Sequence, residues 1–235
     1  VHSSRSSTNY LQGAAATYTL LKGLDLTAFF SYRKIDATLS DKGGIQTIQK
    51  TGLHRTLKEI AKQNIASNTL MGGNINYRNQ GWHIGATGFY TSFSLPLTPD
   101  KSQLYKRFAP QGYNFWNASV DYGYVSHRWT IAGETATGNC GAIATLNAAS
   151  YLFSDHFSLL ALHRFYSARY YSLFSNSFSE GSDVQDENGA YLGFTWIPVH
   201  RWSITGYSDF VYFVWPKYHT KQSTQCWDHL LNILY

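Results

Sequence analysis

The chain has 235 residues, which is enough for one large domain or two small ones. Aromatic residues make up 17% of it and charged residues only 14%, below the roughly 25% charge typical of soluble domains, yet the mean hydropathy is −0.29. The net charge of +5 is spread along the chain and lacks the clustered basic footprint of a nucleic-acid binder, so no nucleic-acid partner is expected. Many aromatics, few charges and a polar mean favour apolar residues that alternate with small polar ones.

Several kinds of segment and site are not expected. The most apolar runs, at 158–162 and 209–215, fall far short of the ~18 residues that a membrane helix needs. Residues 1–9 lack the apolar core of a signal peptide, so we expect a mature, cytoplasmic or fragmentary chain. Cys140 and Cys226 have no His or Cys neighbour at ligand spacing, which predicts neither a metal site nor a cofactor. Two unpaired thiols are the first expectation, and a disulfide between them is the alternative.

The first strand pair is predicted at "LQGAAATYTLLKG" and "GLDLTAFFSY", which meet in a short turn over Lys22–Asp25. Residues 34–68 then form a long connection. Within it, "TGLHRTLKEIAKQN" (51–64) is the one piece with a helical pattern. We therefore expect a surface helix inside an otherwise all-β chain.

This helical segment carries a capping box, because Thr56 precedes Glu59 by three residues. His54 and Arg55 lie just before it. They form the polar pair predicted to gate a lumen or to touch a ligand. The alternative is that the segment only folds onto the rim of the structure.

A recurring unit organises the rest of the chain. "GWHIGATGFY", "RWTIAGETAT", "HFSLLALHRF" and "RWSITGYSDF" each place a large aromatic residue before alternating apolar positions, the pattern of a strand with one apolar face. Each unit follows a short turn, so its first aromatic residue is predicted to join an interfacial aromatic girdle. The girdle residues are Trp82, Trp129, Phe157 and Trp202, and the turns before them are 78–81, 126–128, 154–156 and 199–201.

The connections at the other strand ends are longer. Residues 34–68, 96–112 and 174–188 form them, and only residues 138–141 make a tight turn there. The pattern predicts an all-β, antiparallel up-and-down meander of about ten strands. Short turns at one end and long loops at the other are typical of outer-membrane barrels. We therefore predict a transmembrane β-barrel, or part of a larger one, in the bacterial outer membrane.

Two regions of unequal regularity are expected along the chain. Residues 1–220 are predicted to form the barrel region. Residues 221–235, "KQSTQCWDHLLNILY", abandon the alternation and are expected to be an irregular tail that is foreign to the barrel.

The faces of the strands separate apolar from polar residues. In "FWNASVDYGYV", Trp116 and Val120 fall on one face, and Asn117 and Asp121 fall on the other. One face suits lipid and the other suits water. Alternation alone cannot show which face lies outside, so a soluble ligand-binding barrel is the alternative.

Acidic residues on the polar faces are candidates to line the lumen. They would shape ion selectivity or, alternatively, fill the barrel with an ion-pair network together with Arg164 or Arg169. His163 and Arg164 are adjacent and so point to opposite faces, which puts one of them in conflict with a simple lipid-facing assignment; a bulge at that point would resolve the conflict. The acidic candidates are Asp121, Glu134 and Asp209.

Catalysis is not expected. A hydrolase at the outer rim would need a Ser, a His and a carboxylate together, and the chain has no hydrolase elbow, zinc-protease or phosphate-loop motif. A barrel hydrolase with a rim active site is kept as an alternative. Histidines at three short turns are His127, His156 and His200, and those that could reach the other end are His54, His163 and His219.

The "TGLHRTLKEIAKQN" loop, the "GGNINYR…GWHIGATGFYTSFSLPL" hairpin and the "FSEGSDVQDENGAYLGFTW" return together resemble the barrel region of gram-negative outer-membrane proteins. The resemblance spans most of residues 10–220, and it includes family members with a helix-hairpin-helix segment before the barrel. That segment, implied to contact DNA, has no counterpart here. The resemblance also implies periplasmic termini, whereas the short turns would put both ends of this chain outside. We therefore expect a piece of a larger barrel.

The expected function is that of a pore, an uptake protein or a surface-interaction protein. Outer-membrane lipid would surround it and a small solute would be its cargo. The oligomeric state is not predicted.

Overall fold

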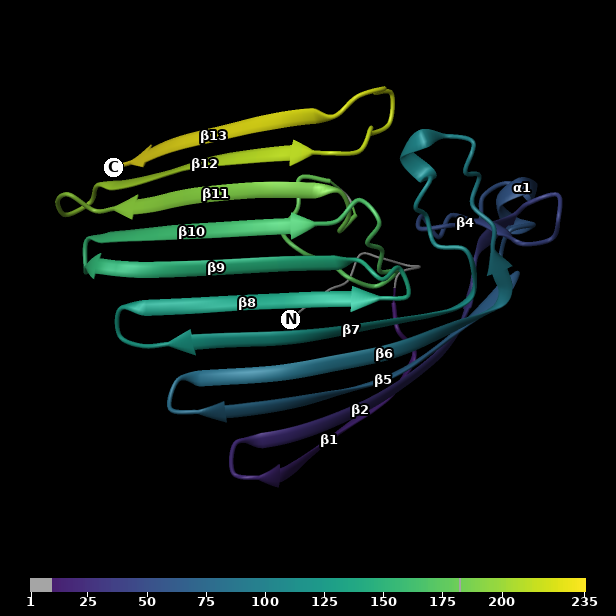
Figure 1. The fold of residues 1–235 in the computed structure, drawn as a ribbon, viewed down its shortest axis with the longest axis horizontal. Coiled ribbons are helices and arrows are strands. Elements are labelled where there is room, and N and C mark those ends of the chain that lie inside the picture. The colour runs from purple at the N-terminus through teal and green to yellow at the C-terminus, as the bar shows by residue number, and fades with distance from the viewer. Residues whose placement is uncertain (1–9, 182) are drawn as a thin grey trace.

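The long strands form an antiparallel meander in which each pairs with the next (Figure 1). The computed structural model describes residues 10–181 and 183–235, so the expectation for residues 1–9 lies outside the described part. The described residues form a 13-stranded sheet, from which only the short β3 and β4 depart from the meander. The strands are β1 (Gly13–Leu21), β2 (Leu24–Ile35), β3 (Ala37–Leu39), β4 (Ile45–Ile48), β5 (Ala66–Asn79), β6 (Trp82–Leu97), β7 (Gly112–Val125), β8 (Trp129–Gly138), β9 (Ile143–Ser154), β10 (Phe157–Tyr166), β11 (Glu187–Trp196), β12 (Ser203–Phe213) and β13 (Thr224–Leu234).

The two faces of the sheet follow from the alternation in the sequence. We call the face that carries Arg164 the inner face, because the β10–β11 connection covers it there, and the opposite face the outer face. On β7, Trp116 and Val120 are exposed on the outer face, whereas Asn117 is buried on the inner face. The register keeps this division between neighbours, since Asp121 of β7 lies opposite Glu134 of β8. The predicted meander with one apolar and one polar face is confirmed.

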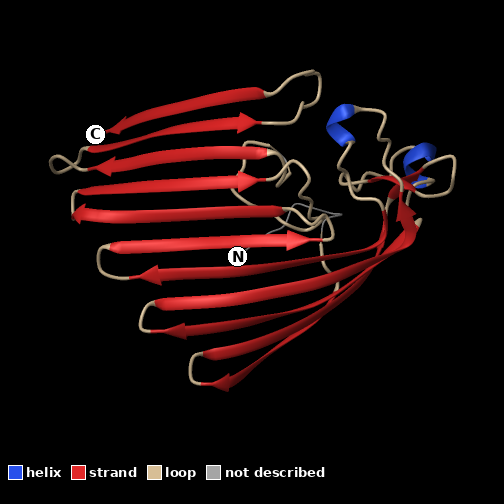
Figure 2. Cartoon of the chain, viewed as in Figure 1, coloured by secondary structure: helices blue, strands red, loops and turns tan. Residues whose placement is uncertain are grey.

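The two ends of the sheet differ, as Figure 2 shows: hairpin turns lie at one end, and the long connections with both short helices lie at the other. We call these the turn end and the loop end. The helices are α1 (Leu57–Ile60) and η1 (Leu104–Lys106). The predicted asymmetry is confirmed, and a tight turn at the loop end joins β8 to β9.

The β5–β6 turn is short because its residues accept left-handed backbone. Between β5 and β6, Gln80 (φ 46°) and Gly81 (φ 85°) both have positive φ, as a two-residue hairpin turn of the favoured twist requires. A Cβ on Gly81 would lie 2.3 Å from the carbonyl oxygen of Val125. Glycine is therefore needed here both for the backbone conformation and for the close approach of the β7 end.

The prediction of an irregular tail is wrong, because residues 224–234 form the strand β13, which pairs with the full length of β12. The alternation is present but weak. Trp227, Leu231 and Ile233 share the outer face with Phe210 and Ile204 of β12. Asp228 and Asn232 lie on the inner face, where Leu230 and Leu234 interrupt the polar pattern. The division into a barrel region and a foreign tail remains a prediction.

Close packing concentrates at the loop end. One buried cluster joins β2, β5, β6 and β7 to the short β3–β4 hairpin, and another lies where β9 and β10 meet the β10–β11 connection. In the described residues, no helix is long and apolar enough to cross a membrane. The first cluster is Ile35, Ala37, Ile45, Ala66, Phe93, Leu97 and Phe115, and the second is Ala144, Tyr166, Tyr170 and Val184.

Candidate functional site

A buried ion-pair group stands on the inner face of β10, β11 and β12. Arg164 donates through Nη1 and Nη2 to the two carboxylate oxygens of Asp209, each at 2.9 Å. Its Nε donates to Glu187. The side chains of Arg164 and Glu187 are fully buried. A Cβ on Gly189 would lie 2.7 Å from Arg164 Cζ, so the glycine leaves the room that the guanidinium occupies. The fork of two parallel hydrogen bonds fixes the guanidinium in place.

The β10–β11 connection is tied to this group. The backbone N–H of Glu180 donates to Glu187 Oε1 at 3.0 Å, and that of Gly181 donates to Oε2 at 3.4 Å. The ring of Phe178 lies 4.8 Å from Arg164 Cζ, in cation–π range. Glu187 therefore joins the wall of the sheet to the segment that covers it.

Further contacts carry the same connection across the inner face toward β7. Tyr166 donates its hydroxyl to the carbonyl of Phe178 at 2.8 Å, and Asn117 of β7 donates Nδ2 to the carbonyl of Tyr171 at 3.2 Å. Tyr170 is buried in the same connection, and burial raises the pKa of Tyr170 to about 12. Residues of the connection thus cover the inner face from β12 as far as β7.

The other acidic candidates lie apart from this group: Asp121 is half-buried, and Glu134 lines a cavity with Tyr170 and Phe174 of the β10–β11 connection. Asp121 and Glu134 are opposite each other on β7 and β8, and His83 Nε2 is 3.6 Å from Asp121 Oδ2. In register, Leu146 of β9 separates Glu134 from Arg164. The structure thus places all four predicted lumen residues on the inner face but in two groups. Whether any of them governs the passage of ions remains a prediction.

His163 and Arg164 point to opposite faces without the predicted bulge, so that prediction is wrong. β10 pairs residue by residue with β9 and β11 through both positions. Arg164 is buried on the inner face, and His163 is exposed on the outer face between Asn147 and Ala190. The imidazole of His163 and its neighbour Asn147 therefore interrupt the apolar outer face.

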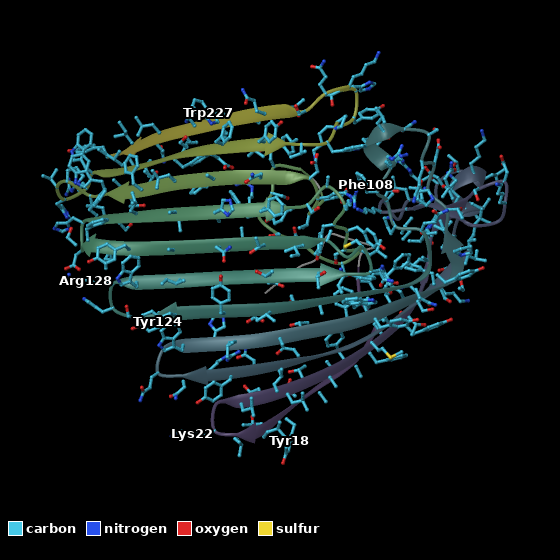
Figure 3. The ribbon with its side chains drawn as sticks, in the orientation of Figure 1. Tyr18, Lys22, Phe108, Tyr124, Arg128 and Trp227 are labelled. Atoms are coloured by element: carbon cyan, nitrogen blue, oxygen red, sulfur yellow. The ribbon has the colours of Figure 1, made fainter. Side chains whose placement is uncertain are left out.

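The four predicted girdle residues all lie at the turn end, on the outer face or at its margin. Trp82 packs against Tyr124 with ring centroids 4.4 Å apart, and Trp129 packs against Tyr151 at 4.5 Å. Figure 3 shows Tyr18, Tyr124 and Arg128 near the hairpin turns and Phe108 among the long connections. The remaining two markers continue the series, with Phe157 5.4 Å from Phe153 and Trp202 5.3 Å from Tyr235. Their role at a membrane interface remains a prediction.

The predicted helix of residues 51–64 is much shorter, since α1 spans only Leu57–Ile60. Its capping box is as predicted: Thr56 Oγ1 accepts from the Glu59 N–H at 3.2 Å, and Glu59 Oε2 accepts from the Thr56 N–H at 3.1 Å. The backbone N–H of Arg55, and to a smaller extent that of Thr56, donates to the Glu59 carboxylate and lowers its pKa. None of the four helical residues is buried. Because helices in proteins are stabilised mainly by the packing of an apolar face, nothing extends this one beyond a single turn.

The two residues of the predicted polar pair before α1, His54 and Arg55, have different surroundings. His54 Nε2 lies 2.8 Å from Asp36 Oδ2, which fastens the segment to the end of β2. Arg55 is exposed, and its backbone N–H donates to Glu59 Oε2 at 2.7 Å. The contacts of His54 match a segment folded onto the rim. The structure does not join it to His163 or His219, since His163 is on the outer face of β10 and His219 follows β12 beside Tyr218.

Neither cysteine is in a disulfide, as both Cys140 and Cys226 are free. Cys140 lies in the β8–β9 turn and Cys226 on the inner face of β13. Within residues 10–181 and 183–235, no three His, Cys, Asp or Glu side chains gather as a metal site would require.

The sequence did not reveal a cavity of about 410 Å³ at the loop end. It lies between the β6–β7, β10–β11 and β12–β13 connections. Asp186, which is buried, has φ 54° and holds the Trp215 N–H at 2.9 Å through Oδ1. The only local signal was a cluster of aromatic and acidic residues spread over three loops. The lining aromatic residues are Tyr105, Phe108, Phe213, Trp215 and Tyr218, and the lining charged residues are Glu180, Asp183, Asp186 and Lys217.

Comparisons with known proteins give neither a family nor a curated relative. No family model matches the chain, and no curated protein matches it. Among solved structures, the toluene transporter TodX of Pseudomonas putida is 12% identical, with a TM-score of 0.35, over 95% of this chain and 74% of that one. The outer-membrane expressed OmpT of Vibrio cholerae is 13% identical, with a TM-score of 0.33, over 91% of this chain and 84% of that one. Because these identities and TM-scores are low, the function proposed next rests on the surfaces of this chain itself.

Proposed function

We propose that this chain forms the wall of a bacterial outer-membrane β-barrel that takes up, or lets pass, a small solute. One observation carries the proposal: the outer face exposes large apolar side chains along most of the strands, interrupted mainly by Asn147, His163 and His229. A soluble monomer rarely leaves so extensive an apolar surface in water. The residues that form it include Leu26, Ile75, Ile84, Val120, Leu192, Leu231 and Ile233, each between 42% and 66% exposed.

Aromatic residues border this apolar band at both ends, as expected at the two interfaces of a bilayer. At the turn end stand the girdle residues and their ring partners. At the loop end the outer face carries a second series. Its members are Phe30, Tyr32, Tyr90, Trp116, Phe165 and Tyr212, all exposed.

The inner face supports a route for solute rather than an apolar core. Asn74, Thr87, Asp121 and Glu134 line it on β5 to β8, and part of it is open. A soluble barrel would instead bury its apolar face and expose its polar one. The same inner face is covered near β10, so we expect a partly plugged passage.

Closing this sheet takes further strands. The eleven described strands of the meander are all antiparallel to their neighbours, so β1 and β13 run in the same direction. In an all-antiparallel barrel they cannot pair directly, and an odd number of additional strands must lie between them. The open edges fit the prediction of a larger barrel. Membership of the helix-hairpin-helix group of outer-membrane proteins also remains a prediction.

A pair of adjacent substitutions on β7 tests the membrane location. Val120→Arg places a charge on the outer face, and Ser119→Arg places the same charge on the inner face. At the middle of a bilayer the first should cost about 2–4 kcal/mol of folding free energy, and the second should cost much less because it meets water. The measurement is the fraction of refolded protein that floats with phosphatidylcholine vesicles in a density gradient. Equal flotation of both variants, or a wild-type protein that stays soluble without detergent, would contradict the proposal.

Passage of solute is measured separately, as ion conductance after reconstitution into planar bilayers. Flotation without conductance would leave a membrane barrel but reject the pore.

A further inference from the structure

The loop-end cavity has the size and lining of a ligand site. Its volume of about 410 Å³ is within the range of small-molecule pockets, about 300–1,000 Å³. Three connections that are far apart in the sequence supply its walls, and none of the predicted lumen residues lines it. The cavity is therefore distinct from the open inner face near Asp121.

A buried carboxylate in this cavity has an open hydrogen-bonding position. Asp186 is only 4% exposed, and its Oδ1 accepts from the Trp215 N–H at 2.9 Å. Its Oδ2 is buried and has no hydrogen-bond partner. Lys217 Nζ lies 3.6 Å from Oδ2, which makes an ion pair without a hydrogen bond, and donates instead to the carbonyl of Gln185 at 3.3 Å. A buried carboxylate oxygen of this kind favours a donor that carries positive charge.

The aromatic walls already attract cations from the chain itself. Lys217 Nζ lies 4.5 Å from the ring centroid of Phe213, and Arg169 Cζ lies 5.9 Å from that of Phe108. Trp215 is held in place by its indole N–H, which donates to the carbonyl of Leu104 at 2.8 Å, and by an edge contact with Phe108. Rigid rings beside a carboxylate are the arrangement that recognises organic ammonium groups.

We propose that this cavity binds a small organic cation, a protonated amine on an apolar body. The ammonium group donates to Asp186 Oδ2, and the apolar body lies against Phe108, Phe213 and Trp215. The Lys217 ammonium lies close to the position that the ammonium group of the ligand would take, and the ligand displaces it. This binding goes beyond the proposed function, because it needs the cavity but not an open pore.

The test is titration calorimetry of the full chain in detergent micelles with three probes of similar shape: 2-phenylethylammonium, 2-phenylethanol and 3-phenylpropionate. The cation should bind most tightly. Asp186→Asn keeps an acceptor for the Trp215 N–H but removes the charge, and should weaken cation binding by roughly tenfold or more. Lys217→Met removes the competing ammonium and should strengthen cation binding several-fold.

Opposite results would overturn the proposal. If the anion binds best, and Lys217→Met abolishes binding while Asp186→Asn strengthens it, the site recognises acids. If none of the probes binds the wild-type chain, the cavity has no such role. Asp155→Asn, in the β9–β10 turn at the other end of the sheet, is the matched control and should change nothing.

Two further measurements keep the test independent of folding and of membrane location. Phe108→Leu should weaken binding of the cation more than that of the alcohol even if Asp186→Asn does not fold; equal losses would contradict the role of the ring. Burial raises the pKa of the Asp186 carboxyl, so the carboxylate should take up a proton, and lose the cation, at a higher pH than an ordinary aspartate when the solution is acidified. An affinity that does not change with pH would contradict the contact. Flotation with vesicles is scored separately, so failure of the membrane proposal leaves this result readable.

Discussion

Two parts of the inner face carry acidic residues, but these residues differ in burial and in their ion-pair partners. On β10 to β12, Arg164, Glu187 and Asp209 are buried beneath the β10–β11 connection and satisfy one another. On β7 and β8, Asp121 and Glu134 lie opposite each other and are less buried: His83 approaches Asp121, and Glu134 lines a cavity with Tyr170 and Phe174 of the same connection. An acidic residue on the inner face is therefore held within the structure where the connection covers it and the guanidinium of Arg164 reaches it. Whether Asp121 and Glu134 meet a solute remains a prediction.

The largest effect is expected from Arg164→Met in the covered part. The substitution leaves Glu187 and Asp209 buried without their cation, and breaking such a buried pair should cost about 3–5 kcal/mol of unfolding free energy. Chemical denaturation in detergent measures it. Arg128→Met in the exposed β7–β8 turn is the control and should change stability by less than about 0.5 kcal/mol. If both variants were equally stable, the buried group would not be what holds the covered part.

A second prediction compares two glycines. Gly189→Ala puts a Cβ 2.7 Å from Arg164 Cζ and should cost about 1–3 kcal/mol, because the guanidinium must move within a packed wall. A Cβ at Gly88 on β6 meets nothing within 4 Å, so Gly88→Ala should be nearly neutral. The measurement is the midpoint of chemical unfolding. A larger loss for Gly88→Ala than for Gly189→Ala would show that strand flexibility matters more than room for Arg164.

A third prediction concerns the far attachment of the connection. Asn117→Ala removes the donor to the Tyr171 carbonyl and should cost about 1 kcal/mol, with earlier cleavage of the β10–β11 connection by a protease. Asn74→Ala on β5 removes an amide that bonds Thr87 on the more open wall, and should leave that cleavage unchanged. Identical protease sensitivity in the two variants would break the distinction between the two parts.

The smallest effect on stability is expected in the open part. Asp121→Asn and Glu134→Gln should each change unfolding free energy by less than about 0.5 kcal/mol, since these carboxylates hold no buried partner. In a conducting barrel they should lower the preference for cations over anions, as read from the reversal potential in a salt gradient. Unchanged selectivity together with a large loss of stability would reverse their assignment.

Most of the meander could be predicted because its signals are local. Period-two alternation predicts the face of each residue, and Gly23 and Gly81 mark two of the short turns. Where local signals are weak, prediction failed. In β13, Leu230 and Leu234 interrupt the polar face, and the strand is recognised only because β12 offers it a paired edge.

Only two of the three residues in the buried ion-pair group could be predicted from the sequence. The sequence places Arg164 and Asp209 on one face, but Glu187 lay in a segment with the composition of a loop. Its burial depends on the backbone of Glu180 and Gly181 folding back over it, which no periodicity records. The loop-end cavity was missed for the same reason, since Phe108, Asp186 and Trp215 come together only through the packing of three connections.

The contacts that hold the β10–β11 connection also determine how often it opens. Every 1.4 kcal/mol that holds a segment closed lowers the fraction of molecules in which it is open about tenfold. If Arg164, Glu187 and their partners hold the connection by about 3 kcal/mol, on the order of 1% of molecules would be open at any moment. Current through such a barrel would then arrive as rare, separate events, and the average flux would report how often the segment lifts rather than how wide the passage is.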